Sequence, residues 1–391
     1  MPFALVYDPA LENYRFGTGH PMRPERFSMA VDLMRSWNLI SEENDAALIA
    51  PADAGERELL LAHSADYIAA VEKASADPSA ADSRYGLGPG DTPAFPGMHP
   101  AATLAVGATM TATGVVVGGS ARRAFAPSGG LHHAHRDRAA GFCVYNDCVV
   151  AIEHTTRAHP GMRIAYVDID AHHGDGVQEA FYERPDVLTL SVHESGSYLY
   201  PGTGHPRETG EGPGRGYAMN VALPPYADDA CYALSLERAI APALRAFAPD
   251  LVFLQGGADT HKDDPLTHLA LTIEGYTVLV SGIIDLTQEL CGGRLVMVGG
   301  GGYEPFSVVP RMWACAFALL VGVEIPHTVP EDWLAKARRH VPQAPQQTLA
   351  EESAAPAREA NAEALRLTDR VLEELAGGHP LLSAWERRDI G

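Results

Sequence analysis

The chain has 391 residues, of which 46% are hydrophobic and 20% are charged. This composition can form a large buried core and differs from that of disordered proteins, which contain few apolar residues. The formal net charge of -21 argues against nucleic-acid binding, because nucleic-acid-binding proteins need a basic surface.

Cysteine usage and apolar runs predict a cytoplasmic protein. The five cysteines are scattered and form no Cys-x-x-Cys pair, which favours a reducing compartment over a disulfide framework. The stretch MPFALVYDPALENY at the N-terminus lacks the basic start and long apolar run of a signal peptide. The longest apolar run, MWACAFALLVGV, is too short to cross a bilayer. We therefore expect a buried helix there and no membrane partner.

Short apolar runs rich in β-branched residues alternate with helix-like segments along the chain. Each run lacks polar alternation, which is typical of strands buried on both faces of a parallel sheet. With helices expected at 149–160 and 231–249, the alternation predicts an α/β fold with a mostly parallel sheet. The predicted strands are FALVYD (3–8), RIAYVDID (163–170), DVLTLSVHE (186–194), DLVFLQGG (250–257) and RLVMVGGGG (294–302).

Two irregular segments, 77–100 and 129–147, are predicted to be loops because they are interrupted by glycine and polar residues. Long loops inside a compact domain usually carry function. From about Ile325 the composition changes to alanine, glutamate and arginine. We therefore expect a main domain at 1–325 and a C-terminal helical extension at 326–391, packed on that domain or trailing from it.

Polar residues gather where four of the predicted strands end. In open α/β sheets, ligands bind outside the carboxyl ends of the strands, so these residues predict one binding rim. The residues are Asp168, Asp170 and His172 after the first strand, Ser191 and His193 after the second, Asp259 after the third and Tyr303 after the fourth.

The DIDAHH segment indicates a metal site. If the strand continues through it, Asp168, Asp170 and His172 point to the same face. Acidic and imidazole groups that share one face need a positive partner, and a divalent metal supplies one. With Asp259 as a third ligand, two carboxylates and one imidazole suit a catalytic zinc or iron ion. The alternative is a surface strand end with solvated carboxylates.

The segment GGLHHA places His132 and His133 side by side in a loop. Each imidazole needs an acceptor that fixes its tautomer, and Asp168 and Asp175 are available. Two His–Asp pairs beside a metal suit general acid–base catalysis. Tyr303, after four glycines, is a candidate hydrogen-bond donor to a developing oxyanion, or else a packing tyrosine.

Taken together, these motifs resemble the zinc-dependent histone deacetylase family. They occur in the family's order between about residues 14 and 325, and GLGPGDTPAFPGMHPAA is similar to the bacterial acetoin-utilization branch. The resemblance implies an arginase–deacetylase fold, a three-layer α/β/α architecture with an eight-stranded, mostly parallel sheet. The matching motifs are GHPMRPER, GGLHHA, GFCVYND, VDIDAHHGDGVQEAF, PGTG, GGADT and GGGGY.

The resemblance also implies roles for individual residues. It implies Zn²⁺, with Fe²⁺ as the alternative, held by Asp170, His172 and Asp259. It pairs His132 with Asp168 and His133 with Asp175, and it makes Tyr303 the oxyanion donor. Substrate-binding residues implied by the family are Asp91, Gly141, Phe142, Tyr200, Leu266 and Gly301, and Arg26 belongs to an internal channel below the metal. A structural K⁺ site is implied at Asp168, Asp170, His172, Ser191 and Val192.

The activity implied is hydrolysis of the acetyl amide of acetyl-lysine in proteins or peptides, to lysine and acetate. The branch favours acetylated metabolic enzymes, such as acetyl-CoA synthetase, over histones. Tyr200 replaces the phenylalanine of many relatives and Leu131 replaces a tryptophan, which leaves substrate preference open. The alternatives are an acetylpolyamine amidohydrolase with the same chemistry, a two-manganese ureohydrolase, and a non-catalytic acetyl-lysine binder. The sequence does not predict the oligomeric state.

Overall fold

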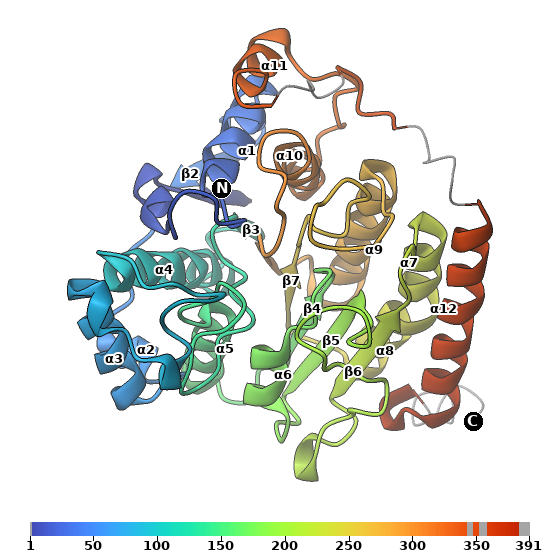
Figure 1. Ribbon diagram of the computed structural model, residues 1–391. Helices are drawn as coiled ribbons and strands as arrows, with labels where there is room; N and C mark the ends of the chain where they lie inside the picture. The colour runs from blue at the N-terminus through green and yellow to red at the C-terminus, as the bar shows by residue number, and fades with distance from the viewer. Residues whose placement is uncertain (1, 342–346, 352–357, 383–391) are drawn as a thin grey trace.

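The computed structural model describes residues 2–341, 347–351 and 358–382. Within these ranges, eight strands form one sheet in the order β2-β1-β3-β8-β7-β4-β5-β6, and every neighbouring pair is parallel (Figure 1). The predicted eight-stranded α/β fold is confirmed, and the sheet is entirely parallel. The strands are β1 (Phe3–Val6), β2 (Ala46–Ile49), β3 (Arg123–Ala126), β4 (Ile164–Asp168), β5 (Val187–Glu194), β6 (Ala218–Leu223), β7 (Leu251–Gln255) and β8 (Leu295–Val298).

The burial of individual strands explains why some of them could be predicted from the sequence. Every residue of β4, β5, β7 and β8 is buried, and β4, β7 and β8 read as nearly continuous apolar runs. β5 is also fully buried but includes Thr189, Ser191 and His193. The register pairs Asp168, at the end of β4, with Ser191 of β5 and Gln255 of β7. The carboxyl ends of these strands therefore meet at one edge of the sheet, where the polar residues were expected.

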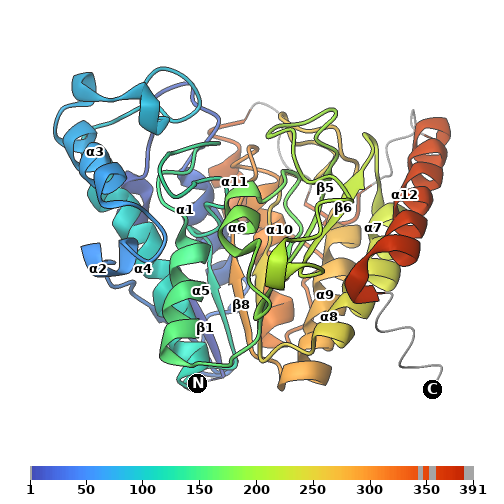
Figure 2. The same cartoon turned by 90° about the horizontal axis from the view of Figure 1, so that it is seen from below.

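Helices cover both faces of the sheet (Figures 1 and 2). α4, α5 and α6 form one layer, and α1, α10, α9, α7 and α8 form the other. A π-helical turn joins α7 to α8, so the expected helix at 231–249 is interrupted once. The helices are α1 (Glu25–Ser36), α2 (Glu56–Leu59), α3 (Ala65–Ala76), α4 (Met98–Val117), α5 (Asp147–Ala158), α6 (Asp175–Phe181), α7 (Asp229–Ser235), α8 (Ala241–Phe247), α9 (Ile273–Cys291), α10 (Val309–Val321), α11 (Glu331–Ala337) and α12 (Arg358–Gly378).

Two apolar helices belong to the core. α4 is long and apolar enough to span a membrane, but 61% of its most apolar stretch is buried against the rest of the protein. It packs on β1, β3, β8 and α5. α10, at the apolar run expected to be a buried helix, is almost entirely buried, which confirms that prediction.

The C-terminal region reaches across the main domain. α11 packs on α1, where Trp333 Nε1 donates a hydrogen bond to the carbonyl oxygen of Met29. α12 lies along β6 and α7 at the sheet edge (Figure 1). Between them, the Glu351 side chain is only 7% exposed and accepts hydrogen bonds from the main domain. The described residues of the C-terminal region thus contact the rest of the protein at α1, at β6 and α7, and through Glu351.

Candidate metal centre and its surroundings

Asp170 and His172 lie in the turn after β4, not on the strand. β4 ends at Asp168, so the expectation that strand alternation aligns Asp168, Asp170 and His172 is wrong. Backbone N–H groups organise the turn instead. The His172 N–H donates to Asp170 Oδ1 at 2.9 Å, and the Ala171 N–H donates to Asp259 Oδ1 at 2.9 Å.

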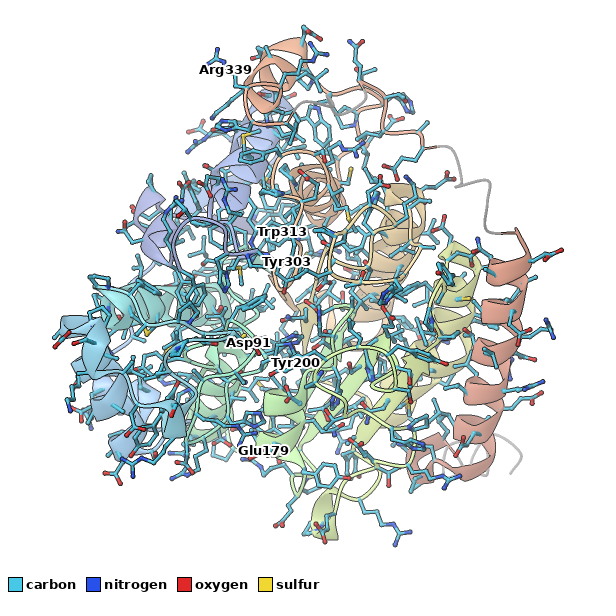
Figure 3. All side chains as sticks on the ribbon, in the orientation of Figure 1. Asp91, Glu179, Tyr200, Tyr303, Trp313 and Arg339 are labelled. Carbon is cyan, nitrogen blue, oxygen red and sulfur yellow. The ribbon has the colours of Figure 1, made fainter. Side chains whose placement is uncertain are left out.

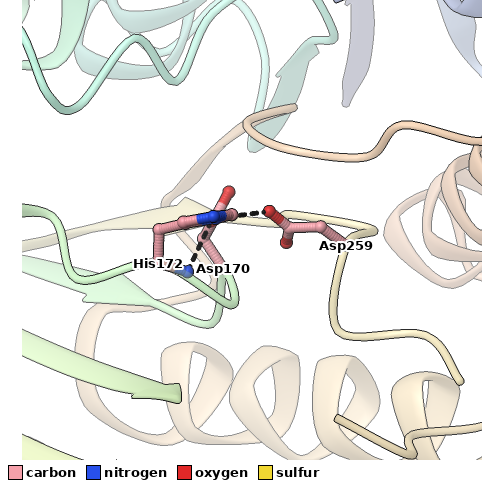
Figure 4. A group of neighbouring side chains, drawn as sticks. All are labelled: Asp170, His172 and Asp259. Carbon is pink, nitrogen blue, oxygen red and sulfur yellow. Dashed lines mark hydrogen bonds and ion pairs between the residues drawn. The ribbon is translucent and has the colours of Figure 1, made fainter. Parts of the chain in front are cut away.

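The three side chains converge on one point (Figure 4). Their ligand atoms all lie within 4.8 Å of one another, and all three residues are buried. His172 Nδ1 is 2.9 Å from Asp259 Oδ2 and 3.3 Å from Asp170 Oδ1. This set of two oxygens and one nitrogen leaves coordination positions open, which fits a catalytic Zn²⁺ or Fe²⁺ ion.

The electrostatics of the cluster favour a cation. Burial and the charge of Asp170 raise the pKa of Asp259 to about 6. Burial opposes protonation of His172, but Asp170 and Asp259 outweigh it and raise the His172 pKa to about 10. Two buried carboxylates that face one imidazole thus favour a positive charge at this point.

The backbone of the glycine run after β8 lies close to the carboxylates of Asp170 and Asp259. The Gly301 N–H donates to Asp170 Oδ2 at 2.6 Å. A Cβ on Gly301 would lie 2.0 Å from Asp259 Oδ2, so any side chain there would displace the ligand. This close approach explains why the loop needs glycine.

The two neighbouring histidines each meet one aspartate. His132 Nδ1 lies 2.9 Å from Asp168 Oδ2, and His133 Nδ1 lies 2.7 Å from Asp175 Oδ1. Their Nε2 atoms are 3.1 Å apart, which requires that one nitrogen carries a proton and the other accepts it. Burial lowers the pKa of His132, but Asp168 and Asp170 outweigh it and raise the pKa to about 9. Burial and the His132 charge lower the pKa of His133 to about 3, which makes His133 the neutral acceptor.

Aromatic rings lie around His172, the imidazole of the candidate metal site. The His133 ring centroid is 5.8 Å from that of His172 and 5.0 Å from that of Tyr200. The Tyr303 ring lies 6.2 Å from His172 and 5.8 Å from Phe142. His133 and Tyr303 therefore both contact the His172 ring, and Tyr200 and Phe142 stand beside them.

The other predicted residues lie at different depths. Asp91 is exposed, and its backbone oxygen accepts from His20 Nε2 at 3.2 Å. In projection, Asp91 and Tyr200 lie next to each other at the centre of the molecule, with Tyr303 near them (Figure 3). The Leu266 N–H donates to Asp264 Oδ1 at 2.9 Å, in the loop after β7.

Arg26 lies deep in the protein and is only 2% exposed. Its Nη1 donates to the Gly302 carbonyl oxygen at 2.9 Å, and its guanidinium stacks on Phe27 and Trp313. Of the residues assigned to a K⁺ site, Ser191 and Val192 are buried in β5, and Ser191 is the register partner of Asp168.

Comparison with known proteins identifies the chain. Residues 20–320 match the family described as "Histone deacetylase domain". The chain belongs to the histone deacetylase family. It is therefore an amidohydrolase of the deacetylase type, and Asp170, His172 and Asp259 form its candidate buried metal site.

Relatives within the deacetylase family cover most of the chain. The acetoin utilization protein AcuC of Bacillus subtilis is 42% identical over 340 residues, which cover 86% of this chain and 87% of that protein. The AcuC protein of Staphylococcus aureus strain MSSA476 is 35% identical over the same length. This deacetylase is thus of the AcuC type.

Solved structures agree with the fold. A crystal structure of a histone deacetylase homologue in complex with SAHA has a TM-score of 0.82 and 31% identity. It covers 94% of this chain and all of that one. The homologue from Aquifex aeolicus has a TM-score of 0.80 and 30% identity, with 93% of this chain covered.

The deacetylase site also contains residues that sequence reasoning missed. Asp147 accepts from the N–H groups of Gly130 and Leu131, at 2.9 and 2.7 Å, and so fixes the loop that carries His132. Asp264 Oδ2 accepts from the Tyr303 N–H at 2.8 Å. Asp147 lies in the motif GFCVYND, and Asp264 lies four residues after GGADT. Both carboxylates accept hydrogen bonds from backbone N–H groups, and such contacts leave no pattern in a sequence.

Proposed function

We propose that this deacetylase hydrolyses the acetyl amide of acetyl-lysine in proteins or peptides, releasing lysine and acetate. One observation carries the proposal: a proton acceptor, His133, and a hydroxyl donor, Tyr303, both contact the ring of the buried ligand His172. Those are the groups that hydrolysis of an unactivated amide needs beside a Lewis acid.

We assign Zn²⁺ to Asp170, His172 and Asp259, with Fe²⁺ as the alternative. A bound divalent ion would polarise the acetyl carbonyl and lower the pKa of a water molecule towards ~7. His133, oriented by Asp175, accepts the proton of that water as its oxygen attacks the carbonyl carbon. The Tyr303 hydroxyl donates a hydrogen bond to the resulting oxyanion, and loss of such a donor typically costs on the order of 10²–10³ in rate.

The proton then goes to the lysine nitrogen as the carbon–nitrogen bond breaks. In this assignment His133 is the principal base, and His132, paired with Asp168, is a cationic partner that stabilises negative charge. The raised pKa of His132 and the lowered pKa of His133 support that division.

The remaining assignments concern the substrate path. Gly141, Phe142 and Tyr200 would line the tube for the lysine stem, together with Leu266 and Gly301. Asp91, exposed near Tyr200, would accept a hydrogen bond from the substrate backbone, and Arg26 would lie in the channel below the metal. A structural K⁺ would bind near Asp168, Asp170, His172, Ser191 and Val192.

The physiological substrate we propose is an acetylated metabolic enzyme in the cytoplasm, such as acetyl-CoA synthetase. The AcuC relatives support it, because their names connect them with acetoin utilization and not with chromatin. The net charge of -21 fits a partner that is neither nucleic acid nor an anionic membrane.

A substrate panel tests the proposal. Acetyl-lysine peptides, acetylpolyamines and small amides are assayed with enzyme loaded with defined Zn²⁺ or Fe²⁺. We expect acetyl-lysine peptides to have the highest kcat/KM, with one metal per chain by elemental analysis. Absence of hydrolysis of every acetyl-lysine peptide would refute the proposal, preference for acetylpolyamines would establish the alternative, and two metals per chain would indicate a ureohydrolase.

A further inference from the structure

His135 contacts the catalytic aspartate from the side opposite His133. Asp175 Oδ1 accepts from His133 Nδ1 at 2.7 Å, while His135 Nε2 lies 3.3 Å from Asp175 Oδ2. The other nitrogen of His135, Nδ1, lies 2.5 Å from Glu179 Oε2. Each oxygen of Asp175 thus faces a different histidine, and α6 supplies both carboxylates from successive turns.

The contacts fix the charge of His135. Carboxylates only accept hydrogen bonds, and a neutral imidazole has one N–H to donate. Because both ring nitrogens of His135 face carboxylates, the ring satisfies both only as an imidazolium. Burial lowers the pKa of His135, but Asp175 and Glu179 outweigh burial and raise it, against the opposing charge of Arg138.

The His135 ring is enclosed by the protein, whereas its partner Glu179 is accessible to solvent. The His135 side chain is 6% exposed and the Glu179 side chain is 59% exposed. Both line a pocket of about 800 Å³ that also includes Asp175 and Tyr200. A second pocket, of about 340 Å³, also includes His135 and Glu179. The other charged side chains that line these two pockets are Arg136, Arg138, Glu153, Arg157, Glu183, Arg184 and Glu208.

We propose that His135 is a positioning residue for deacetylation: as an imidazolium held by Glu179, it binds Oδ2 of Asp175 and keeps Oδ1 directed at His133. This inference rests on the proposed function. A carboxylate held at one oxygen can rotate, whereas one held at both fixes the tautomer and the ring orientation of its histidine. The catalytic pair His133–Asp175 thereby becomes a four-residue chain that ends at a surface glutamate.

Substitutions of His135 separate its hydrogen bonding from its packing. His135→Phe keeps the ring shape but removes both donors, and we expect kcat to fall about tenfold with KM unchanged. His135→Gln keeps an N–H₂ group that can reach a carboxylate, and it should restore most of the lost kcat. The control is His154→Phe, at an exposed position of α5, which should leave kcat and KM unchanged.

A spectroscopic experiment tests the charge independently of activity. In enzyme labelled with ¹⁵N-histidine at pH 7, the signals lost in His135→Phe identify His135. We expect both of its ring nitrogens to carry a proton. Glu179→Gln, an exposed substitution that should leave folding intact, should remove one of these protons and lower kcat less than His135→Phe does.

The two experiments also separate this inference from the proposed function. A His135 ring with a single proton, or wild-type kcat in His135→Phe, would overturn the inference, as would an equal loss of kcat in the Phe and Gln variants. If the wild-type enzyme hydrolyses no acetyl-lysine peptide, the proposed function fails, while the ring protonation of His135 and its response to Glu179→Gln still test the four-residue chain.

Discussion

The position of the His133 ring depends on the absence of one methyl group. Gly141 has a positive φ of +50°, and a Cβ at this residue would lie 2.4 Å from Cδ2 of His133. Only glycine satisfies both conditions, because a side chain there would be strained and would also push the imidazole. The loop that follows the two histidines therefore helps to orient the His133 ring, and Gly141 does so through its backbone.

Gly141→Ala should impair catalysis more than stability. Displacement of a catalytic group by about 1 Å can cost on the order of 10²-fold in rate, so we expect a fall in kcat of at least about tenfold. The strain at positive φ should cost about 1 kcal/mol of unfolding free energy. Steady-state kinetics and thermal denaturation measure the two effects.

Gly161→Ala is the matched control for that substitution. Gly161 also has a positive φ, of +91°, but a Cβ there would meet nothing within 4 Å. It should lose a similar amount of stability and keep full activity. Equal kcat in the two variants would show that Gly141 does not position His133.

At the scale of an element, α4 shows how a helix is held against a loop. Gly107 of α4 lies against the backbone of Ala52, where a Cβ would come within 1.6 Å of the Ala52 carbonyl oxygen. Gly114 lies two turns further along the same helix, and a Cβ there would meet nothing within 4 Å. Packing therefore requires glycine at residue 107, whereas Gly114 only lowers the helix propensity of α4.

Alanine substitutions should therefore have opposite effects at these two positions. Gly107→Ala forces α4 away from the loop and should lower the unfolding free energy by about 1–3 kcal/mol. Gly114→Ala should raise it by roughly 0.5–1 kcal/mol, because alanine has the higher helix propensity. Urea denaturation of both variants measures the difference, and a stable Gly107→Ala variant would contradict the packing described here.

The elements also show what a sequence can and cannot predict. β4, β7 and β8 were predictable because burial on both faces leaves a nearly continuous apolar run, and β5 because it is rich in valine, leucine and threonine. β3, with the sequence RAFA, is too short for such a pattern, and its place in the sheet is set by β1 and β8 on either side. β2 and β6 are the two edge strands and gave no signal that was recognised.

The same contrast holds within the site. The metal cluster was predicted on the condition that the strand continues through Asp170 and His172, and the end of β4 at Asp168 contradicts this condition. The three ligands together were assigned from the family resemblance. The contact of His135 with Asp175 went unrecognised, because it joins residues 40 positions apart, on a loop and on α6. Contacts of this kind depend on tertiary packing, which a single sequence does not reveal.

At the scale of the whole molecule, Glu351 ties the C-terminal extension to the main domain. Its Oε2 lies 2.9 Å from His261 Nε2 and accepts from the Ile273 N–H at 3.1 Å, and its Oε1 lies 3.3 Å from Arg311 Nη2. Burial opposes ionisation of Glu351, but His261 and Arg311 outweigh it and lower its pKa from 4.5 to about 2. We infer that the extension at 326–391 stabilises the main domain at 1–325 through this carboxylate.

Glu351→Gln should lower the unfolding free energy at pH 7 by on the order of 2 kcal/mol. The folded-state pKa is depressed, so the contribution is complete above pH 4.5 and is lost as the pH falls to about 2. The difference between wild type and variant should shrink over that window in denaturation experiments. Glu324→Gln, at an exposed site, is the control, and a difference that does not change with pH would exclude the charge of Glu351 as the cause.

During translation, His261 and Arg311 are synthesised before Glu351, their acidic partner. His261 and Arg311 are 0% and 5% exposed, and their acidic partner is made some forty residues after Arg311. Domains generally fold as units as the chain leaves the ribosome, so we expect the loop that carries Asp259 and His261 to reach its final packing only after Glu351 has been synthesised. A nascent chain that stops before Glu351 would contain every residue assigned to catalysis but would leave the buried His261 and Arg311 without this carboxylate.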